Sequence, residues 1–240
     1  MKITYLDHSG FSIEMGKLLL IFDYYNTTPA GAPGLQGGTI TRELVESFER
    51  VYFFASHNHY DHFSSQIYSL AAPHVRYILD VGILNHPEEL NITRISQSRP
   101  YEDDWLRARA CPSTDIGCSL KVEVQGKTIF HAGDLNCWHW AMDCSMEEEL
   151  QNRNNFDVAL DSIATHMDRP DVAFFPVDPR LKGPFDDGAL LFIHRFRPRL
   201  FVPMHFVGDF SIPARFKSKV GQFQPVFAPS RRGDSFVLEG

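Results

Sequence analysis

Three histidines and one aspartate lie within six consecutive positions, and this cluster constrains the fold more than any other feature of the sequence. It reads H-x-H-x-D-H and consists of His57, His59, Asp61 and His62. The run from 49 to 55 precedes it, and the β-branched and aromatic residues at its core predict a short buried strand. We therefore expect the cluster on a loop at the C-terminal end of a strand, where a rigid sheet positions it.

The spacing of the four residues favours a metal site. In an extended loop, His57 and His59 point the same way, so their imidazoles can bind one ion. Asp61 and His62 are adjacent, and a turn can direct both toward a second ion. Imidazole together with carboxylate suits zinc, with manganese or iron as alternatives. The competing interpretation is a surface loop that is rich in histidine by chance.

A strand-end H-x-H-x-D-H loop resembles the signature of the metallo-β-lactamase-fold superfamily of metal-dependent hydrolases. Within it, the sequence is similar to the small single-domain bacterial members, a branch that includes lactonase-like enzymes. The resemblance implies an α+β fold, a four-layer αββα sandwich of two mixed β-sheets flanked by helices. It covers essentially all of the chain, so we expect one metallo-hydrolase domain over residues 1–240.

Two later positions match further ligands of this superfamily. Asp134 follows Gly133 after a predicted β-hairpin, and the glycine allows the sharp turn that projects the carboxylate from the strand end. The resemblance implies that this aspartate bridges two metals, whereas an ordinary Gly-Asp turn is the alternative. His205 follows the predicted strand at 200–203 and resembles the last metal ligand, with a core histidine as the alternative.

One expected ligand is absent. The superfamily supplies another histidine on a loop that corresponds to residues 110–119, and none is present there. Ser113, Thr114 and Asp115 stand in its place, and only Asp115 is a good ligand type. We therefore expect Asp115, His139 or water to complete the position of His57 and His59, and we expect this position to hold its ion more weakly. One or two ions are consistent with this set. The metal ligands predicted from the sequence are His57, His59, Asp61, His62, Asp134, His205 and Asp115.

The resemblance implies metal-assisted hydrolysis. Bound ions lower the pKa of a water, and the resulting hydroxide attacks an ester, lactone or phosphodiester bond of a small polar substrate. Asp61 is predicted to orient the nucleophile, and His139 or His205 to protonate the leaving group. The main alternative is a metal-binding protein with a decayed, non-catalytic site. A di-iron oxidoreductase is disfavoured because that branch replaces the residue corresponding to His59 by glutamate.

Apolar runs and turn residues predict the remaining elements. The predicted strands are 2–6, 10–14, 17–23, 75–79, 119–124, 128–131, 156–160, 171–177, 200–203 and 235–238. Helices are predicted at 41–48, 64–71, 188–196 and 210–220, and residues from 143 onward have helical character. His8 and Asp23, near the ends of the first strands, are candidates for the vicinity of the site. We interpret Asp23 as a residue that fixes a loop through backbone hydrogen bonds.

Composition restricts the partners. A net charge of −7 disfavours nucleic-acid binding, and we expect a small-molecule substrate instead. The sequence has no apolar run long enough to span a membrane and no secretory pattern after Met1, so we expect a cytoplasmic protein. The cysteines are then expected to be reduced thiols; they are Cys111, Cys118, Cys137 and Cys144.

Overall fold

The computed structural model describes residues 1–138, 145–181 and 185–239. The chain divides into two compact units, which we call the first unit (Met1–Ile95 with Pro229–Gly240) and the second unit (Ser96–Ala228). A single domain over the whole chain stays a prediction. None of the helices within the described ranges is both long and apolar enough to cross a membrane.

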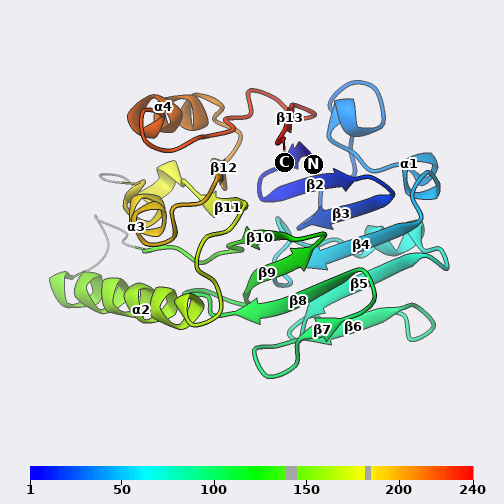
Figure 1. The fold of residues 1–240 in the computed structure, drawn as a ribbon, viewed down its shortest axis with the longest axis horizontal. Helices are drawn as coiled ribbons and strands as arrows, with labels where there is room; N and C mark the ends of the chain where they lie inside the picture. The colour runs from blue at the N-terminus through cyan, green and yellow to red at the C-terminus, as the bar shows by residue number, and fades with distance from the viewer. Residues whose placement is uncertain (139–144, 182–184, 240) are drawn as a thin grey trace. The chain divides into compact units, whose positions relative to one another are not determined.

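The first unit contains a seven-stranded mixed sheet in the order β13-β1-β2-β3-β4-β5-β6 (Figure 1). Its strands are β1 (Lys2–Asp7), β2 (Gly10–Met15), β3 (Leu18–Phe22), β4 (Arg50–Ala55), β5 (Val75–Asp80), β6 (Ile92–Ile95) and β13 (Ser235–Val237). Strands β1 to β3 run antiparallel, whereas β3 to β6 run parallel. The parallel strands therefore end at the same edge, which brings the residues after β3 beside those after β4.

Short helices and a buried cluster cover one face of this sheet. The helical segments are η1 (Leu35–Gly37), α1 (Arg42–Glu46) and η2 (Ser65–Leu70), of which η1 and η2 are 3₁₀ helices. Helix α1 begins where the Thr41 hydroxyl accepts the N–H of Leu44, at 3.2 Å. The side chains of Leu19, Ile21 and Phe53 alternate along their strands and belong to the buried cluster, as a period of two requires.

The second unit contains a six-stranded mixed sheet in the order β12-β11-β10-β9-β8-β7. Its strands are β7 (Tyr101–Glu102), β8 (Leu106–Cys111), β9 (Ser119–Val124), β10 (Lys127–His131), β11 (Val172–Pro176) and β12 (Leu200–Met204). The predicted hairpin joins β9 to β10 through Gln125 and Gly126, both with positive φ, as a tight hairpin turn requires. Strands β10, β11 and β12 run parallel and end at one edge.

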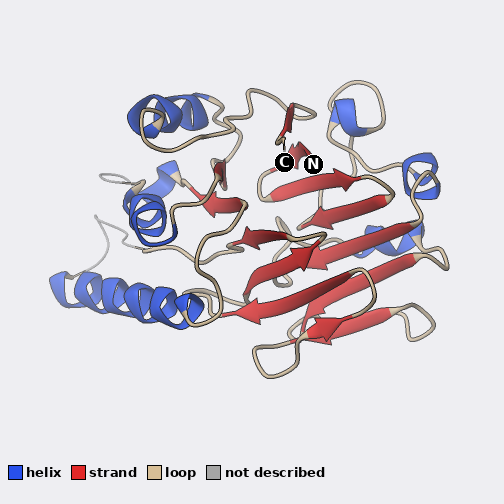
Figure 2. Ribbon diagram, in the orientation of Figure 1, coloured by secondary structure: helices blue, strands red, loops and turns tan. Residues whose placement is uncertain are grey.

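Helices α2 (Met146–Ala164), η3 (Pro179–Leu181), α3 (Asp187–Phe196) and α4 (Ser211–Val220) complete the second unit (Figure 2). Phenylalanines hold two of them on the sheet. The ring of Phe192 in α3 stacks on Phe130 of β10 with centroids 5.1 Å apart, and Phe216 of α4 lies 5.2 Å from Phe201 of β12. The core of this unit is therefore largely aromatic beneath α3 and α4.

The predicted strand at 156–160 is wrong, because these residues lie inside α2. A capping box between Ser145 and Glu148 begins the helix, and it lies far enough upstream to be missed when the apolar run is considered alone. The buried residues Phe156, Ala159 and Ile163 recur at helical spacing, so the helix buries one face. The other predicted elements are present within a few residues, and the predicted α+β class with two mixed sheets is confirmed.

Candidate metal centre

The H-x-H-x-D-H loop follows β4 directly and folds back on itself. The backbone N–H of His62 donates to the carbonyl of His59 at 3.0 Å, so the loop turns between these residues. The rings of His57 and His59 lie 4.5 Å apart between centroids, and those of His57 and His62 lie 4.2 Å apart. The loop therefore gathers its three imidazoles, as the sequence predicted.

Asp23 lies behind this loop as a fully buried carboxylate. Its Oδ1 accepts the backbone N–H of Ser56 at 2.8 Å, and its Oδ2 accepts the Ser56 hydroxyl and lies 2.7 Å from Nδ1 of His62. Asp23 thus fixes the loop, as expected. It also orients His62, a role that the sequence did not reveal. The proton on Nδ1 of His62 points to Asp23, so Nε2 is the atom that can bind a metal.

His8 joins the same cluster from the turn between β1 and β2. It is buried, and its Nε2 lies 3.4 Å from Oδ2 of Asp61. Its ring meets that of His62 edge-on, with centroids 5.6 Å apart. Burial raises the pKa of Asp61, but the neighbouring His8 and His62 imidazoles outweigh this effect and hold the pKa well below its ordinary value. Asp61 is therefore ionised at neutral pH.

In the second unit, Asp134 and His205 come together at the ends of β10 and β12. Gly133 has a φ of 54° and permits the turn after β10. Oδ1 of Asp134 lies 3.3 Å from Nε2 of His205. Both residues are buried, so the structure brings these two predicted ligands together within this unit.

His205 has a buried carboxylate behind it, as His62 does. Oδ2 of Asp178 lies 2.8 Å from Nδ1 of His205, and the Arg180 guanidinium donates to both carboxylate oxygens of Asp178. Burial raises the pKa of Asp178, but the hydrogen bonds with His205 and Arg180 outweigh it and hold the pKa at about 2. The sequence did not point to Asp178, which follows β11 by two residues.

An aromatic side chain borders this second pair. The indole Nε1–H of Trp138 donates to the carbonyl of Asp134 at 2.8 Å, and its ring lies 5.8 Å from that of His205. Trp138 therefore places an aromatic ring beside Asp134 and His205. The predicted proton donor His139 lies outside the described residues.

The loop at 110–119, which lacks the expected histidine, holds a neighbouring loop in place. The Thr114 hydroxyl donates to the carbonyl of Asn136 at 2.6 Å and accepts its N–H at 3.0 Å, so it clamps the loop that carries Asp134. The side chain of Asp115 is exposed and accepts the N–H of Ile116 at 2.8 Å. Among the described residues, Asp115 belongs to neither group of side chains that could hold a metal ion.

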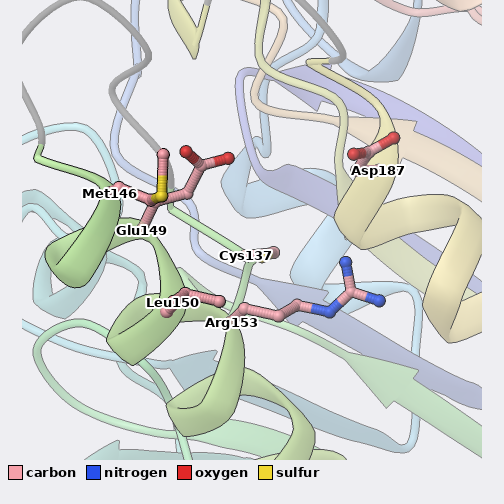
Figure 3. Close-up of a pocket in the computed structure, with 6 residues that line it drawn as sticks. All are labelled: Cys137, Met146, Glu149, Leu150, Arg153 and Asp187. Carbon is pink, nitrogen blue, oxygen red and sulfur yellow. The ribbon is translucent and has the colours of Figure 1, made fainter.

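A separate pocket of about 310 Å³ lies in the second unit, beside the segment that follows Asp134 (Figure 3). It is lined by Cys137, Met146, Glu149, Leu150, Arg153 and Asp187. Arg153 extends from α2 toward α3, which carries Asp187. Burial raises the pKa of the Cys137 thiol to about 11 and that of Cys111 to about 11, so neither is poised to act as a thiolate.

Backbone strain is concentrated at these residues. Among the described residues, six non-glycine residues have a positive φ, and three of the six are His8, Asp23 and His205. Such a conformation costs about 1–3 kcal/mol at each residue and persists only where the surroundings enforce it. The strain therefore marks the candidate centre independently of the motif.

The distances separate two kinds of contact. The carboxylates of Asp23 and Asp178 lie at hydrogen-bond length, 2.7 and 2.8 Å, from the Nδ1 atoms that they orient. The pairs His8–Asp61 and His205–Asp134 are longer, 3.4 and 3.3 Å. Ligand atoms around a tetrahedral zinc with bonds of about 2.0–2.1 Å are roughly 3.3 Å apart. The donor atoms of both pairs are thus spaced like ligands of a metal ion.

Comparisons with known proteins agree with this geometry, although no protein-family profile matches the sequence. A protein of Pelotomaculum thermopropionicum named UPF0173 metal-dependent hydrolase is 26% identical over 92% of this chain and 92% of its own length. The solved structure of Igni18, a metallo hydrolase from Ignicoccus hospitalis, covers 99% of both chains with a TM-score of 0.68 and 21% identity. YhfI from Bacillus subtilis, a metallo-β-lactamase fold protein, covers 98% of both chains with a TM-score of 0.61 and 11% identity.

The fold and the gathered histidine and aspartate residues define the class of metal-dependent hydrolases, which is also the name that the relatives carry. The chain has the metallo-β-lactamase fold and is similar over nearly its whole length to proteins named metal-dependent hydrolases. These similarities support the predicted superfamily, and the predicted enzyme class is confirmed.

Proposed function

We propose that this protein hydrolyses an ester, lactone or phosphodiester bond of a small polar substrate with the help of one or two bound metal ions. The ligands in this proposal come from both units, as the superfamily resemblance implies: His57, His59, Asp61, His62, Asp134 and His205. One observation carries the proposal. In each unit a strand-end histidine, His62 or His205, has its Nδ1 held by a buried carboxylate, which leaves Nε2 for a metal.

The chain's own residues define the chemistry around the ions. A divalent ion supplies a lowered pKa for water, so that hydroxide is available near neutral pH. The Asp61 carboxylate, ionised because of its low pKa, accepts a hydrogen bond from the attacking water and orients it. Nδ1 of His205 faces Asp178, and its Nε2 is the proposed metal-binding atom, so neither nitrogen is left to protonate the leaving group. We therefore assign this proton to His139, on the sequence alone. Trp138 offers an apolar surface beside His205.

The donor set supports zinc as the metal of this proposal. Imidazole nitrogens and carboxylate oxygens suit zinc, and manganese or iron are the alternatives. The net charge of −7 favours a small substrate over a nucleic acid, and a bound ion can still attract an anionic group locally. A cytoplasmic location remains part of the proposal.

Elemental analysis of protein purified without chelator tests the proposal. We expect between one and two equivalents of metal in the wild type and a marked loss in Asp134→Ala. Asp161→Ala is the matched control, since Asp161 is an exposed carboxylate of α2 that pairs with Arg195. The loaded wild type is then assayed on p-nitrophenyl esters, lactones and bis(p-nitrophenyl) phosphate. Metal without hydrolysis of any of them would favour the non-catalytic alternative, and absence of metal would end the proposal.

Asp115 needs its own variant. If its loop contributes a ligand to the position of His57 and His59, Asp115→Ala loses metal from the weaker position only. Unchanged metal content in this variant would leave water as the remaining ligand there. Thr114→Val separates the clamp from the ligand, because it removes the hydrogen bonds to Asn136 and keeps Asp115.

A further inference from the structure

We propose that the second unit has a binding site for a small organic anion at the opposite end of β12 from His205. The site is a pocket of about 700 Å³, within the size range of cavities that hold small organic ligands. The loop before β11, the end of α3 and the loop after α4 line it (Figure 1). Its lining includes Arg169, Ile193, His194, Arg197, Phe223 and Gln224.

This pocket is separate from the candidate metal centre. Arg197 and Pro198 line the pocket and precede β12, whereas His205 follows that strand. The five residues of β12 span roughly 16 Å at about 3.3 Å per residue. A molecule held in the pocket is therefore not the one cleaved beside His205, and the proposal goes beyond the proposed hydrolysis.

The positive charge of the pocket is not used within the protein. Arginines occur at every second position from 195 to 199. Arg195 and Arg199 pair with aspartates at 2.8 and 3.0 Å, and neither arginine lines the pocket. Within the described ranges, Arg169 and Arg197 form no ion pair, and no carboxylate is among the residues that line the pocket. Both guanidinium charges are therefore available to a ligand.

The backbone holds the two arginines together. Nε of Arg169 donates to the carbonyl of Arg197 at 2.8 Å, which leaves the terminal nitrogens of Arg169 for a ligand. Arg197 ends α3 with a φ of 46°, and its N–H donates to the carbonyl of Ile193 at 2.9 Å. A helix that ends in this conformation ordinarily has glycine there. The chain thus bears backbone strain to place a guanidinium at this point.

Complementing the helix dipoles does not account for this charge. The C-terminal ends of α3 and α4 each carry about half a negative charge, and the two guanidiniums together exceed this sum. Guanidinium groups also match the geometry of phosphate and carboxylate, which they bind through two parallel hydrogen bonds. The pocket therefore favours an anion, although the net charge of the protein is −7.

The remaining lining favours an anion with an apolar body. Ile193 is buried in the wall, and Phe223 is 68% exposed, so its ring can pack against a ligand. The buried Gln224 fixes the loop that carries Phe223, because its Nε2 donates to the carbonyls of Pro198 and Pro225 at 2.9 and 3.0 Å. We therefore expect an organic carboxylate or phosphate, rather than inorganic phosphate.

Fluorescence titration with anilinonaphthalene sulfonate tests the site. Its sulfonate stands in for the phosphate or carboxylate, and N-phenylnaphthylamine is the matched probe without this charge. We expect Arg169→Gln and Arg197→Gln each to bind the sulfonate about 10-fold more weakly, as for one lost charge-assisted hydrogen bond. Arg195→Gln is the control of equal charge, since Arg195 pairs with Asp161, and it should match the wild type. Phe223→Ala should weaken the binding of both probes.

Further measurements exclude indirect effects. Arg197→Gly relieves the positive φ, so weaker binding of the sulfonate in this variant cannot be attributed to unfolding. Titrations with and without a metal chelator should agree, because the pocket is separate from the metal centre; this result does not depend on the proposed hydrolysis. Inorganic phosphate should displace the probe far less effectively than phenyl phosphate or octanoate.

Four results would overturn the proposal. They are wild-type affinity in both variants of the pocket arginines, an equal loss in Arg195→Gln, equally tight binding of the uncharged probe, and binding that requires the metal. The first and third would show that charge in the pocket does not attract the ligand. The second would show a general effect of net charge, and the fourth would place the probe at the metal centre.

Discussion

Each unit contains one carboxylate–histidine pair, and the two pairs differ in what else the carboxylate holds. In the first unit, Asp23 lies 2.7 Å from His62, and its other partners are the hydroxyl and N–H of Ser56. In the second unit, Asp178 lies 2.8 Å from His205, and its other partners are the guanidinium and the backbone N–H of Arg180. Both carboxylates are fully buried, but the Arg180 side chain is 47% exposed.

This difference separates two ways to satisfy the hydrogen-bonding capacity of a buried carboxylate. Asp23 relies on dipoles of the loop that it positions, so its hydrogen bonds are tied to the fold of that loop. Asp178 is neutralised by a cation that reaches water, so its partner can be solvated again if the carboxylate is lost. We expect the Asp23 pair to contribute more to stability, and both pairs to contribute similarly to metal binding.

The largest expected effect comes from Asp23→Ala. It removes the acceptor of the Ser56 hydroxyl, the Ser56 N–H and Nδ1 of His62, and each buried group left unsatisfied costs about 1–3 kcal/mol. The free energy of unfolding of the metal-free protein should fall by about 3–5 kcal/mol, measured by urea denaturation. Asp23→Asn, which can still accept from Ser56, should recover part of this loss. A smaller loss of stability than in Asp178→Ala would contradict the stronger structural role assigned to Asp23.

Asp178→Ala should destabilise the metal-free protein less, by about 2 kcal/mol, because Arg180 can turn toward solvent. Its metal affinity should nevertheless fall by about 10–100-fold, as in Asp23→Ala, since both variants free the orientation of a ligand histidine. Chelator competition on the refolded variants measures this. Unequal losses of affinity would show that one histidine dominates the binding of metal.

Ser56→Ala refines the account of the first unit. The hydroxyl is lost while the backbone N–H of residue 56 still donates to Oδ1 of Asp23. We expect a decrease of about 1 kcal/mol in the free energy of unfolding, the usual contribution of one hydrogen bond. A loss as large as that of Asp23→Ala would mean that the hydroxyl, rather than the whole set of bonds, holds the loop.

Val207→Gly should give the smallest effect, a gain of about 0.5–1 kcal/mol in the free energy of unfolding. Val207 is 53% exposed and has a φ of 52°, which is strained for a β-branched residue. The strained backbone of Val207 lies two residues after His205, but Val207 is not one of the proposed ligands. The metal content should therefore not change. Thermal denaturation together with elemental analysis checks both expectations. A loss of metal would indicate that the strain at Val207 helps to position His205.

The failures of the sequence analysis have local causes. The run Phe156–Leu160 has strand-like composition, and only the capping box at Ser145 and the burial of one face identify it as helix. His8 and Asp23 were noted only as neighbours of the site, because a single residue at a strand end carries no periodic signal. Thr114 was considered only as a replacement for a ligand, whereas its hydroxyl clamps the backbone of Asn136.

The sequence by itself determined most of the strands, the resemblance to the superfamily and the gathered imidazoles of residues 57–62, since these depend on local periodicity and on ligands close together in the chain. Only the tertiary structure decided which carboxylates contact Nδ1 of the proposed ligand histidines. Asp23 is 39 residues from His62 and Asp178 is 27 residues from His205. They meet because parallel strands end at one edge of a sheet, so residues far apart in the chain become neighbours, and no spacing in the sequence encodes that contact.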